Sequence, residues 1–142
     1  MKDNSNLLDF NVWSAGEYNK NTNGINTNCI IQTTKEHSNI GENSIKIINN
    51  TGSTKSAYSN TISCMVNKTY TLSCTLYNPG SQVNVVLISN KGTYSVVSVP
   101  PSNVPKRISV SYTTTSDDSG LTCRWNIFSN YCFIDDIVLI SG

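Results

Sequence analysis

In this chain of 142 residues, the nine residues CFIDDIVLI, Cys132 to Ile140, carry the strongest indication of the fold. Seven of the nine are apolar and several are β-branched, which is typical of a β-strand. Two adjacent carboxylates, Asp135 and Asp136, interrupt the apolar run. Successive side chains of a regular strand point to opposite faces, so one of these aspartates should point toward the core. Because a buried carboxylate needs a cation, a metal or several N–H donors, the pair predicts a specific partner.

Similar short apolar runs fill most of the chain upstream, and turn sequences such as NPGS at 78–81 separate them. The predicted strands are 44–48, 57–66, 69–77, 83–89, 93–99, 106–114, 121–128 and 132–140. The segment 14–43 is expected to add one or two irregular strands, near Ile25 and at 29–32. No window shows a helical apolar stripe. The series therefore predicts an all-β protein, an antiparallel two-sheet sandwich or barrel in which residues 1–142 form a single domain.

The composition predicts a polar surface that carries little charge. Asn, Ser and Thr occupy 55 positions, whereas Lys, Arg, Asp and Glu together occupy 19. A net charge of +1, with no basic run, gives no electrostatic case for nucleic acid as a partner. The longest apolar run is too short to span a membrane, and the N-terminus lacks the apolar stretch of a signal peptide. We expect either a domain cut from a larger protein or a protein exported by another route.

Five cysteines do not form an evident metal or disulfide framework. The number is odd, no C-x-x-C spacing occurs, and His37 is the only histidine. Cys74 shares its strand parity with apolar residues, which predicts a buried thiol. Cys123 and Cys132 could face each other across a hairpin, so one disulfide remains an open alternative.

The order of five segments resembles a known family. They are NLLDFNVW (6–13), HSNIGENSIKI (37–47), VNKTYTLSCTLYN (66–78), KRISVSYTT (106–114) and LTCRWNIF with YCFIDDIVL (121–139). Together they resemble the jelly-roll carbohydrate-binding modules of the family 4, 9 and 22 type, which belong to the galactose-binding-like sandwiches. The resemblance implies a non-catalytic carbohydrate-binding module that attaches a larger extracellular or cell-surface protein to a polysaccharide or other glycan.

The same resemblance implies a structural calcium ion as cofactor. Carried over to this chain, its ligands are Asp135, Asn11 and either Glu42 or the carbonyl groups near Gly41 and Ser44. Oxygen ligands of these kinds suit calcium. Asn11 stands where members of the family often carry a glutamate, so one negative charge is missing and the expected affinity is lower. The alternative is that Asp135 accepts backbone N–H bonds or pairs with a lysine, while Asp136 is solvated.

The resemblance places the sugar site on the outer, concave face of one sheet or at the loops along one edge, and we expect the face. That sheet should contain the strands AYSNTIS, LTCRWNIF, VNVVLIS and TYSVVSV. On the strand 121–128, Leu121, Cys123 and Trp125 share the parity assigned to the core, and the alternate residues point outward. The expected ligand residues are Arg124, Asn126, Tyr58, Tyr94, Asn60 and Asn84. Tyrosine rings would stack on the sugar, and the amides and the guanidinium group would bind its hydroxyl groups.

Binding without catalysis is the expected function, because no pair of carboxylates is placed across an identifiable cleft and no G-x-S-x-G motif occurs. The alternative is a structural or adhesion domain of a cell-surface or phage tail protein, with protein rather than sugar partners. The candidate face distinguishes the two. Exposed aromatic rings beside Arg124 favour a sugar, whereas a flat aliphatic face around Val86 and Ile88 favours protein contacts.

Overall fold

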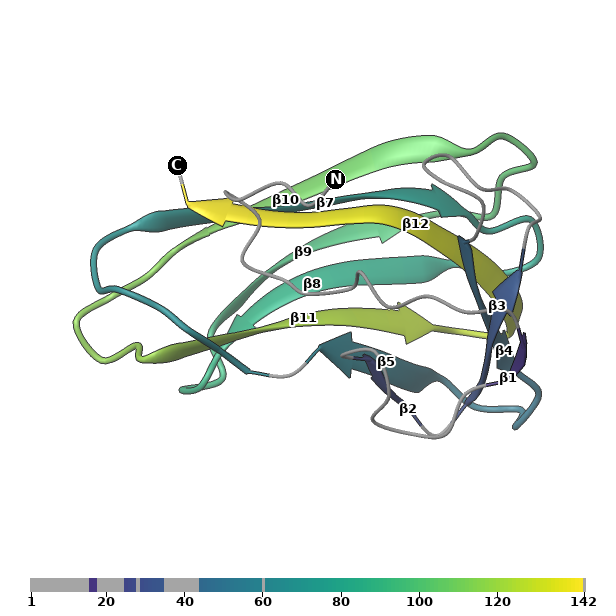
Figure 1. Cartoon of the computed structure of the whole chain (residues 1–142), viewed down its shortest axis with the longest axis horizontal. Coiled ribbons are helices and arrows are strands. Elements are labelled where there is room, and N and C mark those ends of the chain that lie inside the picture. Colours follow the sequence, from purple (N-terminus) through teal and green to yellow (C-terminus); the bar gives the residue numbers. More distant parts are fainter. Residues whose placement is uncertain (1–15, 18–24, 28, 35–43, 60, 142) are drawn as a thin grey trace.

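The computed structural model describes residues 16–17, 25–27, 29–34, 44–59 and 61–141, which contain twelve strands and no helix (Figure 1). The strands are β1 (Gly16–Glu17), β2 (Ile25–Thr27), β3 (Ile30–Thr34), β4 (Ser44–Asn49), β5 (Lys55–Ser59), β6 (Ile62–Ser63), β7 (Thr69–Tyr77), β8 (Val83–Ser89), β9 (Tyr94–Val99), β10 (Lys106–Thr113), β11 (Gly120–Ile127) and β12 (Asn130–Ser141). The described part of the chain holds no helix that is long and apolar enough to cross a membrane.

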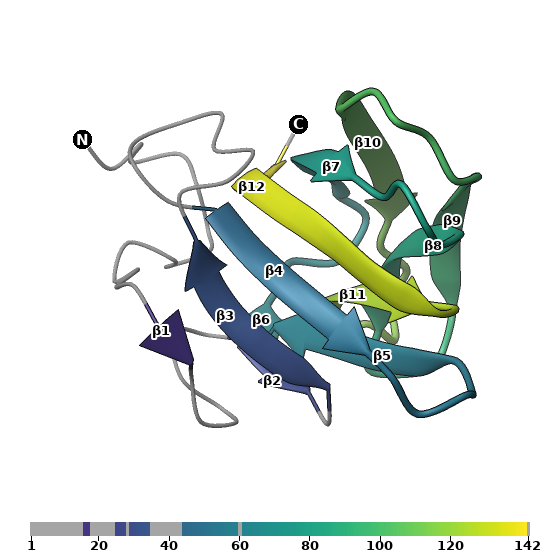
Figure 2. The same ribbon diagram turned by 90° about the vertical axis from the view of Figure 1, so that its right-hand side faces the viewer.

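These strands form two antiparallel sheets that face each other as the layers of a sandwich (Figures 1 and 2). The first, here named the β12 sheet, has the order β1-β3-β4-β12-β7-β10. The second, named the β11 sheet, has the order β2-β5-β11-β8-β9, and β6 also pairs with β11. The all-β, antiparallel two-sheet prediction is therefore confirmed. The predicted strand 57–66 is divided into β5 and β6, and β1 was not predicted.

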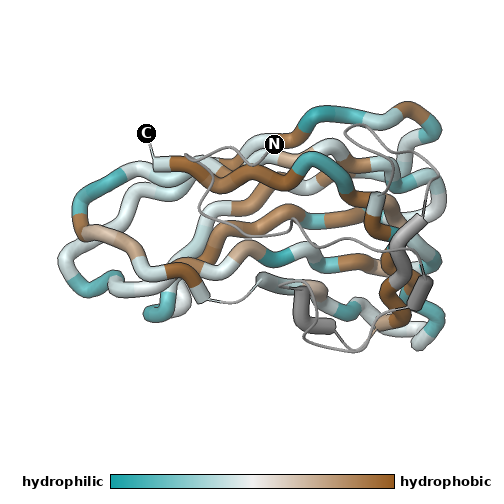
Figure 3. Tube along the Cα trace, viewed as in Figure 1, coloured by the Kyte–Doolittle hydropathy of each residue, from teal (hydrophilic) through white to brown (hydrophobic). Residues whose placement is uncertain are grey.

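Alternation of side chains along the strands builds the hydrophobic core between the two sheets. In β7, Tyr70, Leu72, Cys74 and Leu76 are buried, and the residues between them are partly exposed. Trp125 of β11 is the largest of the fully buried side chains. Figure 3 shows the hydrophobic stretches along the strands of both layers. Burial of Cys74 and Trp125 confirms their prediction as core residues, and Tyr70 and Tyr112 are buried as well.

A β-bulge in β12 resolves the problem of the two adjacent aspartates. Asp135 pairs with Thr75 and Val138 pairs with Ser73, so two residues of β12 lie opposite the single residue between those partners. Before the bulge, Ile134 is buried, and after it Ile137 is buried, whereas Asp135 and Asp136 are both partly exposed. The prediction that one aspartate points into the core is wrong, because the extra residue leaves both on the outer side.

The partner of Asp136 is Arg107, which lies on β10, two strands away from β12 in the same sheet. Asp136 has a φ of 51°, which is the left-handed conformation at the bulge. Arg107 Nη1 donates to the Asp136 carboxylate Oδ2 at 2.9 Å and to its carbonyl oxygen at 2.7 Å. Arg107 Nη2 donates to Ser73 Oγ at 3.2 Å. The cation that the aspartate pair requires is thus a guanidinium group on the outer surface, where such a pair contributes about 0–1 kcal/mol.

None of the five cysteines forms a disulfide, and all but Cys64 are buried. The possible disulfide between Cys123 and Cys132 is not formed, because β11 and β12 belong to different sheets and do not form a hairpin. Burial raises the pKa of Cys74 to about 11 and that of Cys123 to about 12. These thiols therefore remain protonated and act as small apolar side chains.

A buried aspartate ties the turn after β10 to the rest of the sandwich. Asp118 Oδ2 accepts hydrogen bonds from the backbone N–H of Thr115 at 2.8 Å and from the hydroxyl of Tyr112 at 2.7 Å. These bonds, that from the Thr115 backbone foremost, lower the pKa of Asp118. The fold thus stabilises the ionised carboxylate in this turn.

Candidate functional site

The outer face of the β11 sheet is the surface on which the sequence analysis placed a sugar site. The strands β5, β11, β8 and β9 lie side by side in this sheet, which confirms the predicted set of four. On β11, Leu121, Cys123 and Trp125 are buried, whereas Arg124 and the other alternate residues, Thr122 and Asn126, are partly exposed. The predicted inward and outward parity of β11 is confirmed.

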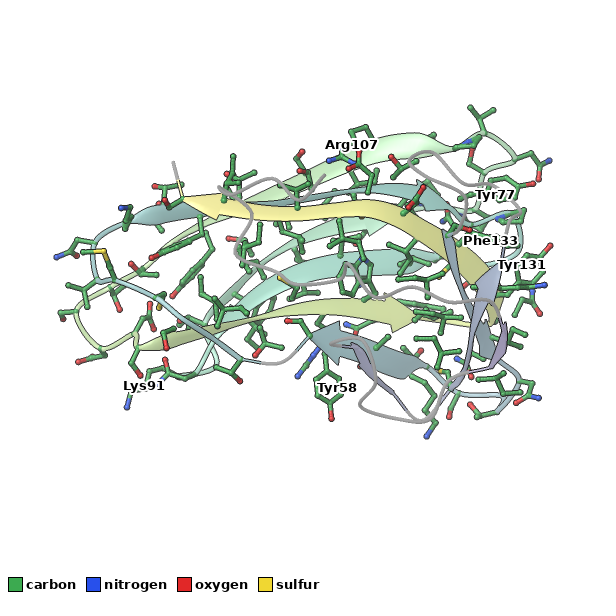
Figure 4. All side chains as sticks on the ribbon, in the orientation of Figure 1. Tyr58, Tyr77, Lys91, Arg107, Tyr131 and Phe133 are labelled. Carbon is green, nitrogen blue, oxygen red and sulfur yellow. The ribbon has the colours of Figure 1, made fainter. Side chains whose placement is uncertain are left out.

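Strand register brings an arginine and a tyrosine together in the middle of this face. Arg124 pairs with Tyr58 of β5 on one side and with Val86 of β8 on the other, and Val86 pairs with Val96 of β9. Tyr58 is 41% exposed, and Figure 4 shows its ring projecting away from the sandwich. These four residues form a row across the face, which we name the arginine row. Its β5 end is aromatic and its β9 end is aliphatic.

A second row, named the amide row, lies next to the first. Asn126 pairs with Ser56 on β5 and with Asn84 on β8, and Asn84 pairs with Ser98 on β9. Ser56 Oγ donates to Asn126 Oδ1 at 2.7 Å, and Gln82 Nε2 donates to Asn84 Oδ1 at 3.1 Å. Side-chain amides at fixed positions are suited to binding hydroxyl groups.

The third row lies on the other side of the arginine row and contains Thr122, Ile88 and Tyr94, paired in that order. Tyr94 is 60% exposed on β9, the last strand of the sheet in the described chain. Across the sheet, Tyr58 and Tyr94 are thus three strand spacings apart, about 14 Å at about 4.8 Å per spacing, and they are also offset by two residues along the strands. A ligand that contacts both rings must extend across the strands, so the face suits an oligomer better than a single small molecule.

Among the residues that the structure describes, the side chain of Arg124 has no hydrogen-bonding partner, unlike that of Arg107. The Nε of Arg124 is buried and lacks a hydrogen-bond acceptor among the described residues. Arg107, by contrast, donates to Asp136, Ser73 and Thr75. Leaving a buried N–H group without an acceptor is unfavourable. The Nη1 and Nη2 groups of the Arg124 guanidinium also bind nothing among the described residues, and they are the donors that an external acceptor could reach.

The structure brings five of the six predicted sugar-site residues onto one face, and the sixth, Asn60, lies outside the described residues. Sequence reasoning missed Ser56, Val96 and Ser98. Their signal was present in the strand period of two, since Ser56 is two residues from Tyr58, and Val96 and Ser98 follow Tyr94 at the same interval.

The expected calcium site is described only in part. Asn11 and Glu42 lie outside the described residues. Asp135 is partly exposed on the outer side of β12, opposite Thr75, and the carboxylate of Asp136 binds Arg107. In the portion of the chain that the structure covers, His, Cys, Asp and Glu nowhere form a group of three that could hold a metal ion. The described residues alone therefore do not complete a calcium site.

A group of aromatic residues on the outer face of the β12 sheet was not predicted. Phe133 pairs with Lys46 of β4 and with Tyr77 of β7, and its ring lies 5.8 Å from those of both Tyr77 and Tyr131. Lys46 Nζ lies 4.9 Å from the ring centroid of Tyr131 (the rings are labelled in Figure 4). Phe133 is only 3% exposed, so this group is a packed cation–π cluster and offers no open ring at its centre.

Comparison with known proteins finds similarity in structure only. No protein-family model and no curated protein sequence matches the chain. The xylan-binding domain CBM22-1 of Xyn10C from Paenibacillus barcinonensis matches with a TM-score of 0.66 at 10% identity, over 92% of this chain and 97% of that one. The module TmCBM61, solved with β-1,4-galactotriose, matches with a TM-score of 0.62 at 12% identity, over 99% and 97% of the two chains.

A protein of another kind has a similar score. The enzymatically active domain of tailspike protein 4 from bacteriophage CBA120 matches with a TM-score of 0.66 at 11% identity, over 84% of this chain. The present chain spans only 19% of that tailspike chain, so the shared fold is one part of a larger protein there. At these identities the comparison establishes the fold. The chain is a jelly-roll β-sandwich of the type found in carbohydrate-binding modules.

Proposed function

We propose that this chain is a non-catalytic glycan-binding module and that the outer face of the β11 sheet is its binding surface. The observation that carries the proposal is Arg124, central on that face, whose guanidinium group has no hydrogen-bond acceptor among the described residues and lies beside the exposed ring of Tyr58. The folds of the xylan-binding domain and of the galactotriose complex support this choice over other small β-sandwiches.

The face supplies the two kinds of contact that sugars need. Tyr58 and Tyr94 present ring surface for the C–H groups of a pyranose. Arg124, Asn126 and Asn84 present hydrogen-bonding groups for its hydroxyls. Each hydroxyl exchanges water for protein at a small net gain of about 0.5–1.5 kcal/mol, so an open face of this kind should bind with modest affinity.

The proposal includes a role within a larger assembly. The matched fold is one part of the tailspike chain. A module of this kind would hold a larger extracellular or cell-surface protein close to its glycan. Chemistry would then be performed elsewhere in such a protein.

Arg124→Ala should weaken glycan binding severalfold or more and leave the melting temperature nearly unchanged, because the side chain lies outside the core. A glycan array would first identify a ligand, and titration calorimetry would then compare the variants. Tyr58→Ala should also weaken binding, whereas Arg107→Ala, on the other sheet, should not. The assignment of this face would be wrong if Arg124→Ala unfolded the protein or bound the ligand as well as the wild type.

We further propose a structural calcium ion, as the family resemblance implies, with Asp135 as one ligand. A ligand that binds only the folded state stabilises it by about 2.7 kcal/mol at one hundred times its Kd. Millimolar calcium should therefore raise the melting temperature, and Asp135→Ala should abolish the rise. Asp117→Ala, which removes an exposed carboxylate from a turn, is the matched control. A melting curve that is identical in calcium and in chelator would contradict the proposal.

The second candidate function is assembly through protein contacts, and the aliphatic part of the same face favours it. Val86 is buried on the outer side, and Val96 is 46% exposed on the last strand of the β11 sheet. An array without any bound glycan, together with a dimer in light scattering that Val96→Lys dissociates, would establish this alternative.

A further inference from the structure

We propose that the glycan bound by the outer face of the β11 sheet is acidic, and that a uronic acid carboxylate of the glycan pairs with Arg124. The inference rests on the proposed function and adds the chemical class of the ligand. It follows from three features of the face, namely its charge, the unused donors of Arg124, and the orientation of the two amides beside it.

The face carries a positive charge at its centre with no carboxylate near it in the same strands. The strands β5, β8, β9 and β11 contain Lys55 and Arg124 as their charged residues, and neither Asp nor Glu occurs in them. Lys55 follows the inward parity of the buried Ala57 and lies at the end of β5, opposite Ile127. Within these four strands, the guanidinium group of Arg124 is thus the charged group that points to the outer face.

The guanidinium group of Arg124 has the four N–H donors of Nη1 and Nη2 available on the outer face. Arginine carries five N–H donors and no acceptor. Among the described residues Arg124 forms no side-chain hydrogen bond and no ion pair, and its Nε is shielded from solvent. A sugar hydroxyl could accept one of these N–H groups but would leave the charge uncompensated in a partly buried place. A carboxylate could accept two N–H groups at once and neutralise the charge.

The two amides of the amide row add donors to the same area. Asn126 Oδ1 and Asn84 Oδ1 each already accept a hydrogen bond from a neighbouring side chain, from Ser56 and Gln82 respectively. The Nδ2 groups of both asparagines have no acceptor among the described residues, so the unoccupied end of each amide is a donor. Asn126 is two residues from Arg124 on one face, and Asn84 is diagonal to it across the β11–β8 pair. The centre of the face is therefore rich in donors, which is complementary to an anion.

The test compares acidic polysaccharides with the same polymers after their carboxyl groups have been reduced to alcohols. Polygalacturonate and glucuronoxylan, each beside its carboxyl-reduced form, are titrated in the presence of a chelator, so that calcium cannot bridge protein and sugar. The wild-type protein is expected to bind at least one acidic polymer about tenfold more tightly than its reduced form, since hydrogen bonds to charged groups are the stronger class. The preference should decrease as salt is raised.

Three variants assign the preference to its residue. Arg124→Gln should bind both members of the pair equally, and Arg124→Lys should keep part of the preference because it keeps the charge without the planar pair of donors. Lys91→Gln, which removes an exposed charge from the turn between β8 and β9, should keep the full preference. Unchanged melting temperatures would show that each variant is folded.

Each other outcome overturns a stated part of the proposal. Equal binding of both members of every pair by the wild type would overturn the acidic ligand and leave a glycan-binding module in place. Failure to bind any of the polymers in either form, with no glycan found on an array, would overturn the module as well. An acid preference that survives in Arg124→Gln and is lost in Lys91→Gln would show a general charge effect and would exclude the assigned site.

Discussion

Replacing Trp125 with alanine is expected to lower the free energy of unfolding by about 3–5 kcal/mol, which is the usual cost of truncating a buried aromatic residue. The indole of Trp125 is fully buried, and its neighbours across the strands are Ala57 and Val85. Those small partners leave the space that the indole fills, so its removal creates a cavity that the sheet cannot easily close. Urea unfolding followed by circular dichroism measures the loss.

The neighbouring residue provides the control. Arg124 lies one position away on the same strand but on the opposite side of the sheet, so Arg124→Ala should change the free energy of unfolding by less than about 1 kcal/mol. Glycan binding should show the reverse order, with Arg124→Ala impaired and Trp125→Ala retaining its affinity at temperatures where it is folded. Equal loss of stability in both variants would mean that the two sides of β11 have been assigned wrongly.

The sequence predicted the fold well because strands of this chain alternate cleanly and end at strong turn signals. The predicted strands 69–77 and 83–89 coincide with β7 and β8, and the parity assigned to β11 from Leu121, Cys123 and Trp125 is correct. Alternation depends only on residues within one strand, so it can be read without knowing which strands are neighbours. The same reasoning placed Arg124 on the outer face.

Features that depend on pairing between strands could not be predicted in this way. The hairpin between Cys123 and Cys132 was wrong because the chain passes from the β11 sheet to the β12 sheet after Ile127. The rows on the candidate face depend on register, which places Tyr58 opposite Arg124 and Ser56 opposite Asn126. A shift of two residues would preserve every inward and outward assignment and yet change each of these pairs.

The bulge at Asp135 and Asp136 was missed although the sequence carried a signal for it. A regular strand that buries Cys132 and Ile134 would next bury residue 136, but the next buried residues are Ile137 and Leu139. Two adjacent polar residues lie between the buried residues Cys132 and Ile134 and the buried residues Ile137 and Leu139, which indicates one extra residue on the outer side. The two aspartates were interpreted instead as one inward and one outward carboxylate. The bulge therefore makes Asp136 the superfluous residue of the strand.

Deletion of Asp136 is consequently expected to leave the protein folded, whereas deletion of Ser73 from the adjacent strand should unfold it or nearly so. Without Asp136, Ile137 would lie opposite Cys74 while Val138 keeps its partner Ser73, so the buried side chains would stay buried. The deletion removes a surface ion pair with Arg107 worth about 0–1 kcal/mol and also removes a left-handed backbone position. The net change in the free energy of unfolding should be within about 2 kcal/mol.

Ser73 is the matched control, because it is also a small polar residue on the outer side of the β12 sheet and lies opposite the end of the bulge. β7 alternates without interruption, so its deletion must turn one half of the strand over and expose either Tyr70 and Leu72 or Cys74 and Leu76. Exposing two such side chains costs about 3–6 kcal/mol at about 1.5–3 kcal/mol each. Urea unfolding of the two deletion variants compares them directly. Similar losses in both would show that the bulge at Asp136 is required for the fold, and that its extra residue does more than extend the outer side of β12.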